Sequence, residues 1–127
     1  MEADKTYQIL VVDDSDYSRS IITSMLENTP YKVVGEAGNA KEAIDILKES
    51  SADVCIIDIV MPEVSGIELT DKLKSMFKHM VVINISSLAQ ESIVMDAIGA
   101  GASDFLQKPF DKDTLISSLS KVVSEIS

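Results

Sequence analysis

Ile9-Leu10-Val11-Val12-Asp13-Asp14 is the stretch that decides the fold, because it is an apolar run that ends abruptly in two acids. The same arrangement returns at residues 54–58, where a second apolar run ends in Asp58. A third run ends in Ser86, and a shorter segment ends in Lys108. Polar groups at the carboxyl ends of buried strands point into the crevice where open α/β sheets bind their ligands. Together these residues suit a site for a divalent cation and a phosphoryl group.

The apolar runs alternate five times with helix-length amphipathic segments, which predicts a repeated strand–helix unit. We expect strands at 7–12, 31–37, 54–58, 81–85 and 104–107. The expected helices cover about 16–28, a segment opened by an Asn39 cap, about 66–78, about 90–100 and a segment from about 111. Unbroken apolar runs in the first, third and fourth strands indicate burial on both faces of a parallel sheet. The prediction is a doubly wound (βα)5 flavodoxin-like fold with strand order 2-1-3-4-5.

The helical spacing also predicts which helix residues face the core. The first helix is expected to bury Ile21, Ile22, Met25 and Leu26, the third Leu69, Leu73, Met76 and Phe77, and the fourth Ile93, Val94, Ala97 and Ile98. These positions recur every three or four residues, as an amphipathic helix requires.

Size and composition limit the class of protein. We expect one domain over residues 1–127, with residues 1–6 as a flexible N-terminal extension. A net charge of −10 argues against direct binding to nucleic acid. The start has no signal peptide and no apolar run approaches the roughly 18 residues of a membrane span, so a cytoplasmic protein is expected. The single Cys55 is expected to be a buried thiol and the single His79 a solvated residue.

The three acids at the strand ends predict a metal site. Asp13, Asp14 and Asp58 would repel one another, and some would stay protonated, unless a cation neutralised them. Hard oxygen ligands with neither Cys nor His at hand favour Mg²⁺ over Zn²⁺. The alternative role for the acid pair is helix capping, for which Ser15 or Asp16 is also available.

Asp58 can also act as a nucleophile, since aspartyl carboxylates accept phosphoryl groups and form acyl phosphates. Lys108 would supply fixed positive charge to the phosphoryl oxygens, and Pro109 after it favours a cis bond that aims the lysine into the crevice. Ser86 offers a hydroxyl to another phosphoryl oxygen. The simpler alternatives are an exposed loop lysine, a loop serine and, for Phe105, a core residue.

These pieces occur together in one order along the chain. The set consists of Asp13-Asp14, Asp58 followed by Met61-Pro62 and Gly66, Ser86, and Lys108-Pro109-Phe110. It resembles the receiver domain of bacterial two-component response regulators, and in particular the single-domain CheY-like proteins. The resemblance spans almost the whole chain with the spacing of the elements intact, and the complete set is far more specific than any single piece.

The resemblance implies a phosphorylation-activated signalling switch rather than an enzyme, since it would catalyse only its own phosphorylation and dephosphorylation. Asp58 would receive its phosphoryl group from a sensor histidine kinase, for which a CheA-like kinase is one candidate. Asp13, Asp14, Asp58 and the Val60 carbonyl would bind Mg²⁺, Ser86 and Lys108 would hold the phosphoryl group, and Phe105 would be the rotating aromatic of the switch. A downstream target, with chemotaxis as the leading pathway, would bind helix four, strand five and helix five.

Two features depart from the pattern of many relatives. Ser65 stands before Gly66 where an acid or Asn is common, which alters only a loop. Val60 and Leu88, two positions after Asp58 and Ser86, are apolar where some relatives are polar. The second departure bears on the lifetime of the phosphoryl group and on the need for a partner phosphatase.

Four other readings account for parts of the pattern. Asp14-Ser15-Asp16 imitates the nucleophile motif of haloacid-dehalogenase phosphatases, but that class leaves Asp58 and Met61-Pro62 unexplained. A flavodoxin-like redox protein needs a phosphate-binding loop, and the acids after strand one would repel the phosphate of FMN. A protein-binding scaffold that is never phosphorylated would not need the acid cluster, and an EF-hand lacks its turn glycine here.

Overall fold

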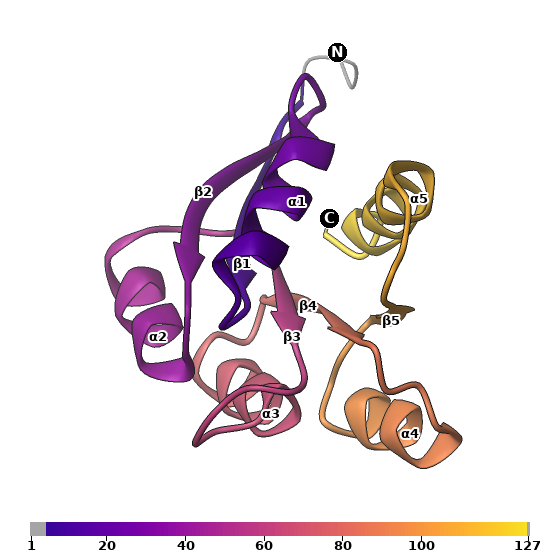
Figure 1. Ribbon diagram of the computed structural model, residues 1–127. Helices are drawn as coiled ribbons and strands as arrows, with labels where there is room; N and C mark the ends of the chain where they lie inside the picture. Colours follow the sequence, from indigo (N-terminus) through magenta and orange to yellow (C-terminus); the bar gives the residue numbers. More distant parts are fainter. Residues whose placement is uncertain (1–4, 127) are drawn as a thin grey trace.

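A computed structural model describes residues 5–126 and shows five strands alternating with five helices (Figure 1). The elements are β1 (Tyr7–Val12), α1 (Asp16–Leu26), β2 (Tyr31–Ala37), α2 (Ala40–Glu49), β3 (Val54–Asp58), α3 (Gly66–Met76), β4 (Val81–Ser86), α4 (Glu91–Gly99), β5 (Asp104–Gln107) and α5 (Lys112–Val123). Of the extension expected at residues 1–6, the first four lie outside the described residues. Lys5 and Thr6 precede β1 without regular secondary structure.

The five strands form one parallel sheet in the order β2-β1-β3-β4-β5, which confirms the predicted fold. The pairing of Val12 with Ile57 brings the residues that follow β1 beside Asp58. Asp58 in turn pairs with Ile85, next to Ser86. The carboxyl ends of β1, β3 and β4 therefore meet at one edge of the sheet, where the order of the strands reverses.

Each strand in the middle of the sheet sends alternate side chains to two separate apolar cores. One core joins β1, β3 and β4 to α1 and α5, and its fully buried members include Ile9, Ile56 and Leu119. The other joins the opposite faces of the same strands to α2, α3 and α4. Because neighbouring strand residues point to opposite faces, a strand with two covered faces needs the unbroken apolar run found in the sequence.

Polar side chains cap four of the five helices described. Ser15, Asn39, Ser65 and Asp111 each accept a hydrogen bond from a backbone N–H in the first turn of α1, α2, α3 and α5. Such a cap satisfies a donor that the helix itself leaves unpaired. Within the described chain α4 alone begins without one, because the Gln90 side chain makes no capping hydrogen bond.

Several details of the helices differ from the predictions. Helices α1 and α3 end at Leu26 and Met76, two residues earlier than expected. Ile21, Met76 and Ile98, expected in the core, are 36%, 45% and 49% exposed. Each lies at the edge of its helix's apolar stripe, whose centre is taken by residues such as Ile22 and Leu73. Strand β4 also runs one residue further than expected, because Ser86 pairs with Gln107.

Cys55 and His79 lie in the surroundings that the sequence predicts. Cys55 is buried, and burial raises the pKa of its thiol to about 12, so the thiol is unreactive near neutral pH. His79 is exposed just before β4, as expected. Between residues 5 and 126, no helix has both the length and the apolar character needed to cross a bilayer.

Candidate functional site

Three carboxylates converge at the carboxyl edge of the sheet. Asp13 and Asp14 follow β1 and Asp58 ends β3, and one oxygen from each lies within 4.8 Å of the others. Asp13 and Asp58 are buried and Asp14 is exposed, so the cluster opens to solvent on one side. Three hard oxygen ligands with an open side match the needs of Mg²⁺, which keeps several water ligands in proteins. The residues therefore fit the metal that the sequence predicts.

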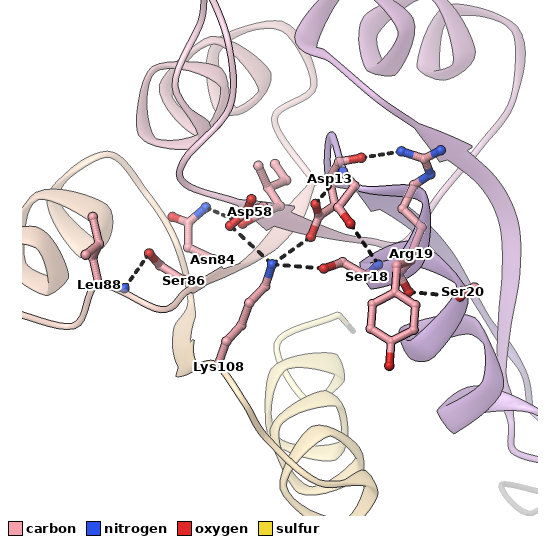
Figure 2. A network of polar contacts seen from close by, with 12 residues as sticks. Asp13, Ser18, Arg19, Ser20, Asp58, Asn84, Ser86, Leu88 and Lys108 are labelled. Carbon is pink, nitrogen blue, oxygen red and sulfur yellow. Dashed lines mark hydrogen bonds and ion pairs between the residues drawn. The ribbon is translucent and has the colours of Figure 1, made fainter.

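Asp13 already uses both of its carboxylate oxygens in contacts with protein groups. Oδ1 accepts a hydrogen bond of 2.9 Å from the Ser15 N–H. Oδ2 accepts one of 2.8 Å from the Lys108 ammonium (Figure 2). Ser15 itself provides the cap of α1 through the Ser18 N–H. Capping by Asp13 or Asp14 is therefore not needed to explain the acid pair.

Lys108 reaches the acids from the end of β5, as the sequence predicts. Its Nζ lies 2.8 Å from Asp13 Oδ2 and 3.6 Å from Asp58 Oδ1, and 3.5 Å from the Ser18 hydroxyl. The Lys108 N–H donates to the Ser86 carbonyl, which ties the start of this loop to β4. The peptide bond between Lys108 and Pro109 is cis. The ammonium is therefore the positive charge that faces both buried acids.

The surroundings of Asp58 disfavour its charged form. Burial raises the pKa of this carboxyl to about 6, the Lys108 ammonium opposes the rise, and the charges of Asp13 and Asp14 add to it. A carboxylate held among other acids with one lysine is only partly neutralised. A divalent cation would supply the missing positive charge, which is a second reason why the cluster suits a metal.

Ser86 ends β4, the strand that pairs with β3 at Asp58, and Phe105 lies on β5, the next strand of the sheet. Ser86 is fully buried, and its hydroxyl accepts a 2.9 Å hydrogen bond from the Leu88 N–H (Figure 2). Among residues 5–126 no hydrogen bond joins Ser86 to Asp58. Phe105 is partly buried and packs against the core shared by α2, α3 and α4, opposite Asn84 in the sheet. Ser86 on β4 and Phe105 on β5 therefore lie on neighbouring strands beside the acid cluster.

The connection between β3 and α3, residues 59–65, is held closely against the site. The Ile59 N–H donates to the Ile85 carbonyl and the Ile59 carbonyl accepts from the Gly66 N–H, at 2.9 and 2.8 Å. A Cβ atom at Gly66 would lie 2.1 Å from the Asp58 carbonyl oxygen, so only glycine fits there. Ser65 caps α3, so the departure noted at this position provides a helix cap. Val60, two residues after Asp58, is 54% exposed.

Two residues of the site were missed by the sequence analysis. Arg19 donates hydrogen bonds to the Asp13 carbonyl and to Asp16, and its Nε lies 3.1 Å from Glu36 on β2. Asn84, fully buried in β4, donates to the Ile57 carbonyl directly before Asp58. Asn84 could have been found as the one polar residue inside the apolar run 81–85. For Arg19 the only indication was a cation five residues after the acid pair.

Comparisons with known proteins agree with this geometry. A family model described as a response regulator receiver domain matches residues 9–120. The chain is 37% identical to the chemotaxis protein CheY of Bacillus subtilis over 93% of this chain and 98% of that protein. It is 35% identical to CheY of Thermotoga maritima, covering 91% and 96%. The CheX–CheY–BeF3–Mg²⁺ complex of Borrelia burgdorferi is similar to it, with a TM-score of 0.85, 28% identity, and coverage of 97% and 91%.

Proposed function

This chain belongs to the response regulator receiver family, and from that premise we propose that Asp58 is its phosphoacceptor and requires Mg²⁺. The chain is homologous to CheY chemotaxis proteins, consistent with a phosphorylation-activated signalling switch. One observation supports the choice of residue most strongly. Of the two buried acids, Asp13 has both carboxylate oxygens hydrogen-bonded, to Ser15 and Lys108, whereas within residues 5–126 the Asp58 carboxylate faces only the Lys108 ammonium, 3.6 Å away.

Asp14, Asp58 and the Val60 carbonyl would be direct ligands of Mg²⁺, with Asp13 acting largely through water. This division is supported by the hydrogen bonds that occupy both oxygens of Asp13. When bound, the metal would neutralise charge on the acids and on the phosphoryl oxygens of the donor. The carboxylates of this chain would hold and orient that charge, with Asp14 on the solvent side.

In the reaction itself, an Asp58 carboxylate oxygen attacks the phosphorus of the donor and the bond to the donor's leaving group breaks. The Lys108 ammonium, which lies between Asp13 and Asp58, would then pair with a phosphoryl oxygen. The Ser86 hydroxyl would donate to another phosphoryl oxygen. Its present bond to Leu88 uses the hydroxyl only as an acceptor, so its proton remains available for donation.

A change at Ser86 would be passed on to Phe105 and then to the target. As Ser86 turns towards the phosphoryl group, it would leave space into which the Phe105 ring can rotate. This would join the site to the surface formed by α4, β5 and α5, and couplings of this kind are typically about 1–3 kcal/mol. The chain would otherwise catalyse no reaction beyond its own phosphorylation and dephosphorylation.

The surface of α4, β5 and α5 has a composition that indicates what kind of target it would bind. Met95 and Ile98 are 64% and 49% exposed on α4. The acids on these three elements and at their ends are Glu91, Asp96, Asp104, Asp111, Asp113 and Glu125, against three lysines, of which Lys108 is directed to the acid cluster and Lys112 and Lys121 lie on α5. An amphipathic target segment with basic side chains would complement this surface.

The proposal also includes a sensor histidine kinase as the phosphoryl donor and a cytoplasmic location.

The rival readings gain no support. A haloacid-dehalogenase phosphatase would use an acid directly after β1 as nucleophile, but Asp14 is exposed and Asp13 is engaged by Lys108 and Ser15. A scaffold that is never phosphorylated leaves the buried acids beside Lys108 without a role. A single receiver domain over residues 1–127 stays part of the proposal.

Phosphorylation from a small-molecule donor tests the proposal. Incubation with acetyl phosphate and Mg²⁺, followed by intact-mass measurement, should show one added phosphoryl group. Asp58→Asn should abolish the added mass, and EDTA should do the same in the parent protein. Undiminished labelling in Asp58→Asn would show that another residue is the acceptor.

A further inference from the structure

A buried polar network lies directly beneath the site, between α3 and β4. Thr70 on α3 and Asn84 on β4 are both fully buried within the core that contains Leu69, Leu73 and Val82. Polar side chains in such surroundings are costly unless they are hydrogen-bonded. An apolar pair of similar size would fill the same space, so the fold alone does not require this network.

The network connects three elements through a continuous chain of hydrogen bonds. Asn84 Nδ2 donates to the Ile57 carbonyl at 3.3 Å and to the Thr70 hydroxyl oxygen at 3.1 Å. The Thr70 hydroxyl donates to the Gly66 carbonyl at 2.7 Å. Strand β3 is thereby tied to the first residue of α3 through a side chain of β4, one residue before the phosphoacceptor.

Gly66 links this network to the connection that carries Val60. Its carbonyl accepts from Thr70, and its N–H donates to the Ile59 carbonyl at 2.8 Å. Its Cα also lies so close to the Asp58 carbonyl that no side chain fits. A displacement of Gly66 would therefore move both ends of residues 59–65, the connection that would supply a carbonyl ligand to the metal.

We propose that Thr70 and Asn84 are positioning residues that hold residues 59–65 in the geometry that binds Mg²⁺. The inference rests on the proposed function, since it assumes that Val60 and Asp58 share a metal. Within residues 5–126 neither side chain makes a hydrogen bond to Asp14, Asp58 or Val60. Both act through backbone groups. Asn84 holds the Ile57 carbonyl, directly before Asp58, and Thr70 holds the carbonyl of Gly66, whose N–H is bonded to the Ile59 carbonyl.

A pair of threonine substitutions separates this role from simple stabilisation. Thr70→Val removes the hydroxyl and keeps the shape, and it should weaken Mg²⁺ binding by about three- to tenfold, as expected for one lost hydrogen bond. Thr70→Ser keeps the hydroxyl and should bind Mg²⁺ as the parent does. Thr23→Val is the matched control, because the Thr23 hydroxyl on α1 is buried and has no hydrogen-bond partner among residues 5–126. It should leave the affinity unchanged.

Calorimetric titration with Mg²⁺ alone measures these affinities, and thermal unfolding measures stability in parallel. The inference is overturned if Thr70→Val loses stability but binds Mg²⁺ like the parent, because the network is then merely structural. If the parent binds no Mg²⁺, the proposed function itself fails together with this inference. These two failures are distinguished by the parent titration.

A measurement on the unmodified protein keeps the inference testable if Thr70→Val does not fold. The side-chain amide of Asn84 gives its own signals in a nitrogen–proton correlation spectrum. These signals should shift during a Mg²⁺ titration with the same midpoint as the metal ligands, while the Thr23 amide stays fixed. Unchanged Asn84 signals at saturating Mg²⁺ would contradict the inference.

Discussion

The two connections that leave the centre of the sheet differ in how firmly they are held. The connection from β3 to α3 is closed by hydrogen bonds on both sides of Ile59, is capped by Ser65 and fits against Asp58 only because residue 66 is glycine. The connection from β4 to α4 exposes Leu88 and leads into a helix without a side-chain cap, and that helix exposes Met95 and Ile98. The first arrangement suits a fixed metal site, and the second suits a surface that changes when Ser86 moves.

The largest effect is expected at the firmly held connection. Gly66→Ala would place a Cβ 2.1 Å from the Asp58 carbonyl oxygen and 2.7 Å from the Ile59 Cα, which are backbone atoms that cannot move aside locally. We expect a loss of more than about 3 kcal/mol in the free energy of unfolding, together with loss of Mg²⁺ binding. Urea unfolding and Mg²⁺ titration measure the two effects.

Gly99→Ala is the matched control on the loosely held side. Among the described residues, a Cβ at Gly99 would meet no heavy atom within 4 Å beyond its chain neighbours and its own helix backbone, and this residue ends α4. Alanine is favoured over glycine in a helix by up to about 1 kcal/mol, so this variant should be as stable as the parent or slightly more stable. Equal losses in the two variants would contradict the difference drawn between the connections.

The next effect concerns the lifetime of the phosphoryl group. It is tested with Val60 from the β3–α3 connection and Leu88 from the β4–α4 connection. Hydrolysis needs a water aligned with the acyl phosphate of Asp58, and the exposed Val60 and Leu88 offer it no side-chain hydrogen bond. Replacing them with Asn and Glu should speed loss of the phosphoryl group, and positioning one group commonly changes a rate by around 10²-fold. Loss of the added mass after removal of the donor measures the rate.

The single variants Val60→Asn and Leu88→Glu separate the contributions of the two connections to the rate of hydrolysis. Val60→Asn should account for most of the acceleration, because residues 59–65 are held in place and can position a water more accurately. If the double variant loses its phosphoryl group no faster than the parent, water positioning at these residues does not control the lifetime.

A smaller effect, on stability, follows from the ionisation of Asp58, next to the firmly held connection. Burial raises the pKa of Asp58 to about 6 from a usual value near 3.8, so the folded protein disfavours the ionised form. Well below pH 3.8 both states are protonated and the penalty vanishes, it grows as the pH rises from about 4 to about 6, and at pH 7 it is almost fully present. Without metal at pH 7, Asp58→Asn should therefore be more stable than the parent, with a free energy of unfolding that is larger by about 1–3 kcal/mol.

Chemical unfolding at pH 4 and pH 7 in EDTA measures this difference. The advantage of Asp58→Asn should shrink towards zero at pH 4 and should also shrink when Mg²⁺ is added to the parent at pH 7. A constant difference at both pH values would mean that the ionisation of Asp58 does not contribute.

The sequence predicted the sheet and the members of the site better than it predicted their contacts. Continuous apolar runs define strands buried on both faces, so four of the five strands have the expected bounds and the polar residues after them meet at one edge. The contact between Thr70 and Asn84 depends instead on how α3 packs on β4. Ile21, Met76 and Ile98 were wrongly predicted to be buried, because periodicity gives the direction of the apolar stripe of a helix but not its width.

The direction of the Ser86 hydroxyl could not be predicted either. Its residue type and position at the end of β4 were evident, but its bond to the Leu88 N–H is a local turn contact. Arg19 was overlooked because its three partners are the Asp13 backbone carbonyl, Asp16 on its own helix and Glu36 on β2, and only the fold brings the first and last of these to it.

The most direct test is a map of backbone amide shifts before and after phosphorylation with acetyl phosphate and Mg²⁺, with a Mg²⁺-only spectrum as the reference. We expect large changes from Ser86 through α4 to Phe105, and small further changes at residues 59–66 once the metal is bound. Ser86→Ala should still accept the phosphoryl group but should lose most of the changes around Phe105. Changes confined to residues 59–66, or an unaltered Phe105 response in Ser86→Ala, would contradict a fixed metal side coupled to a mobile signalling side.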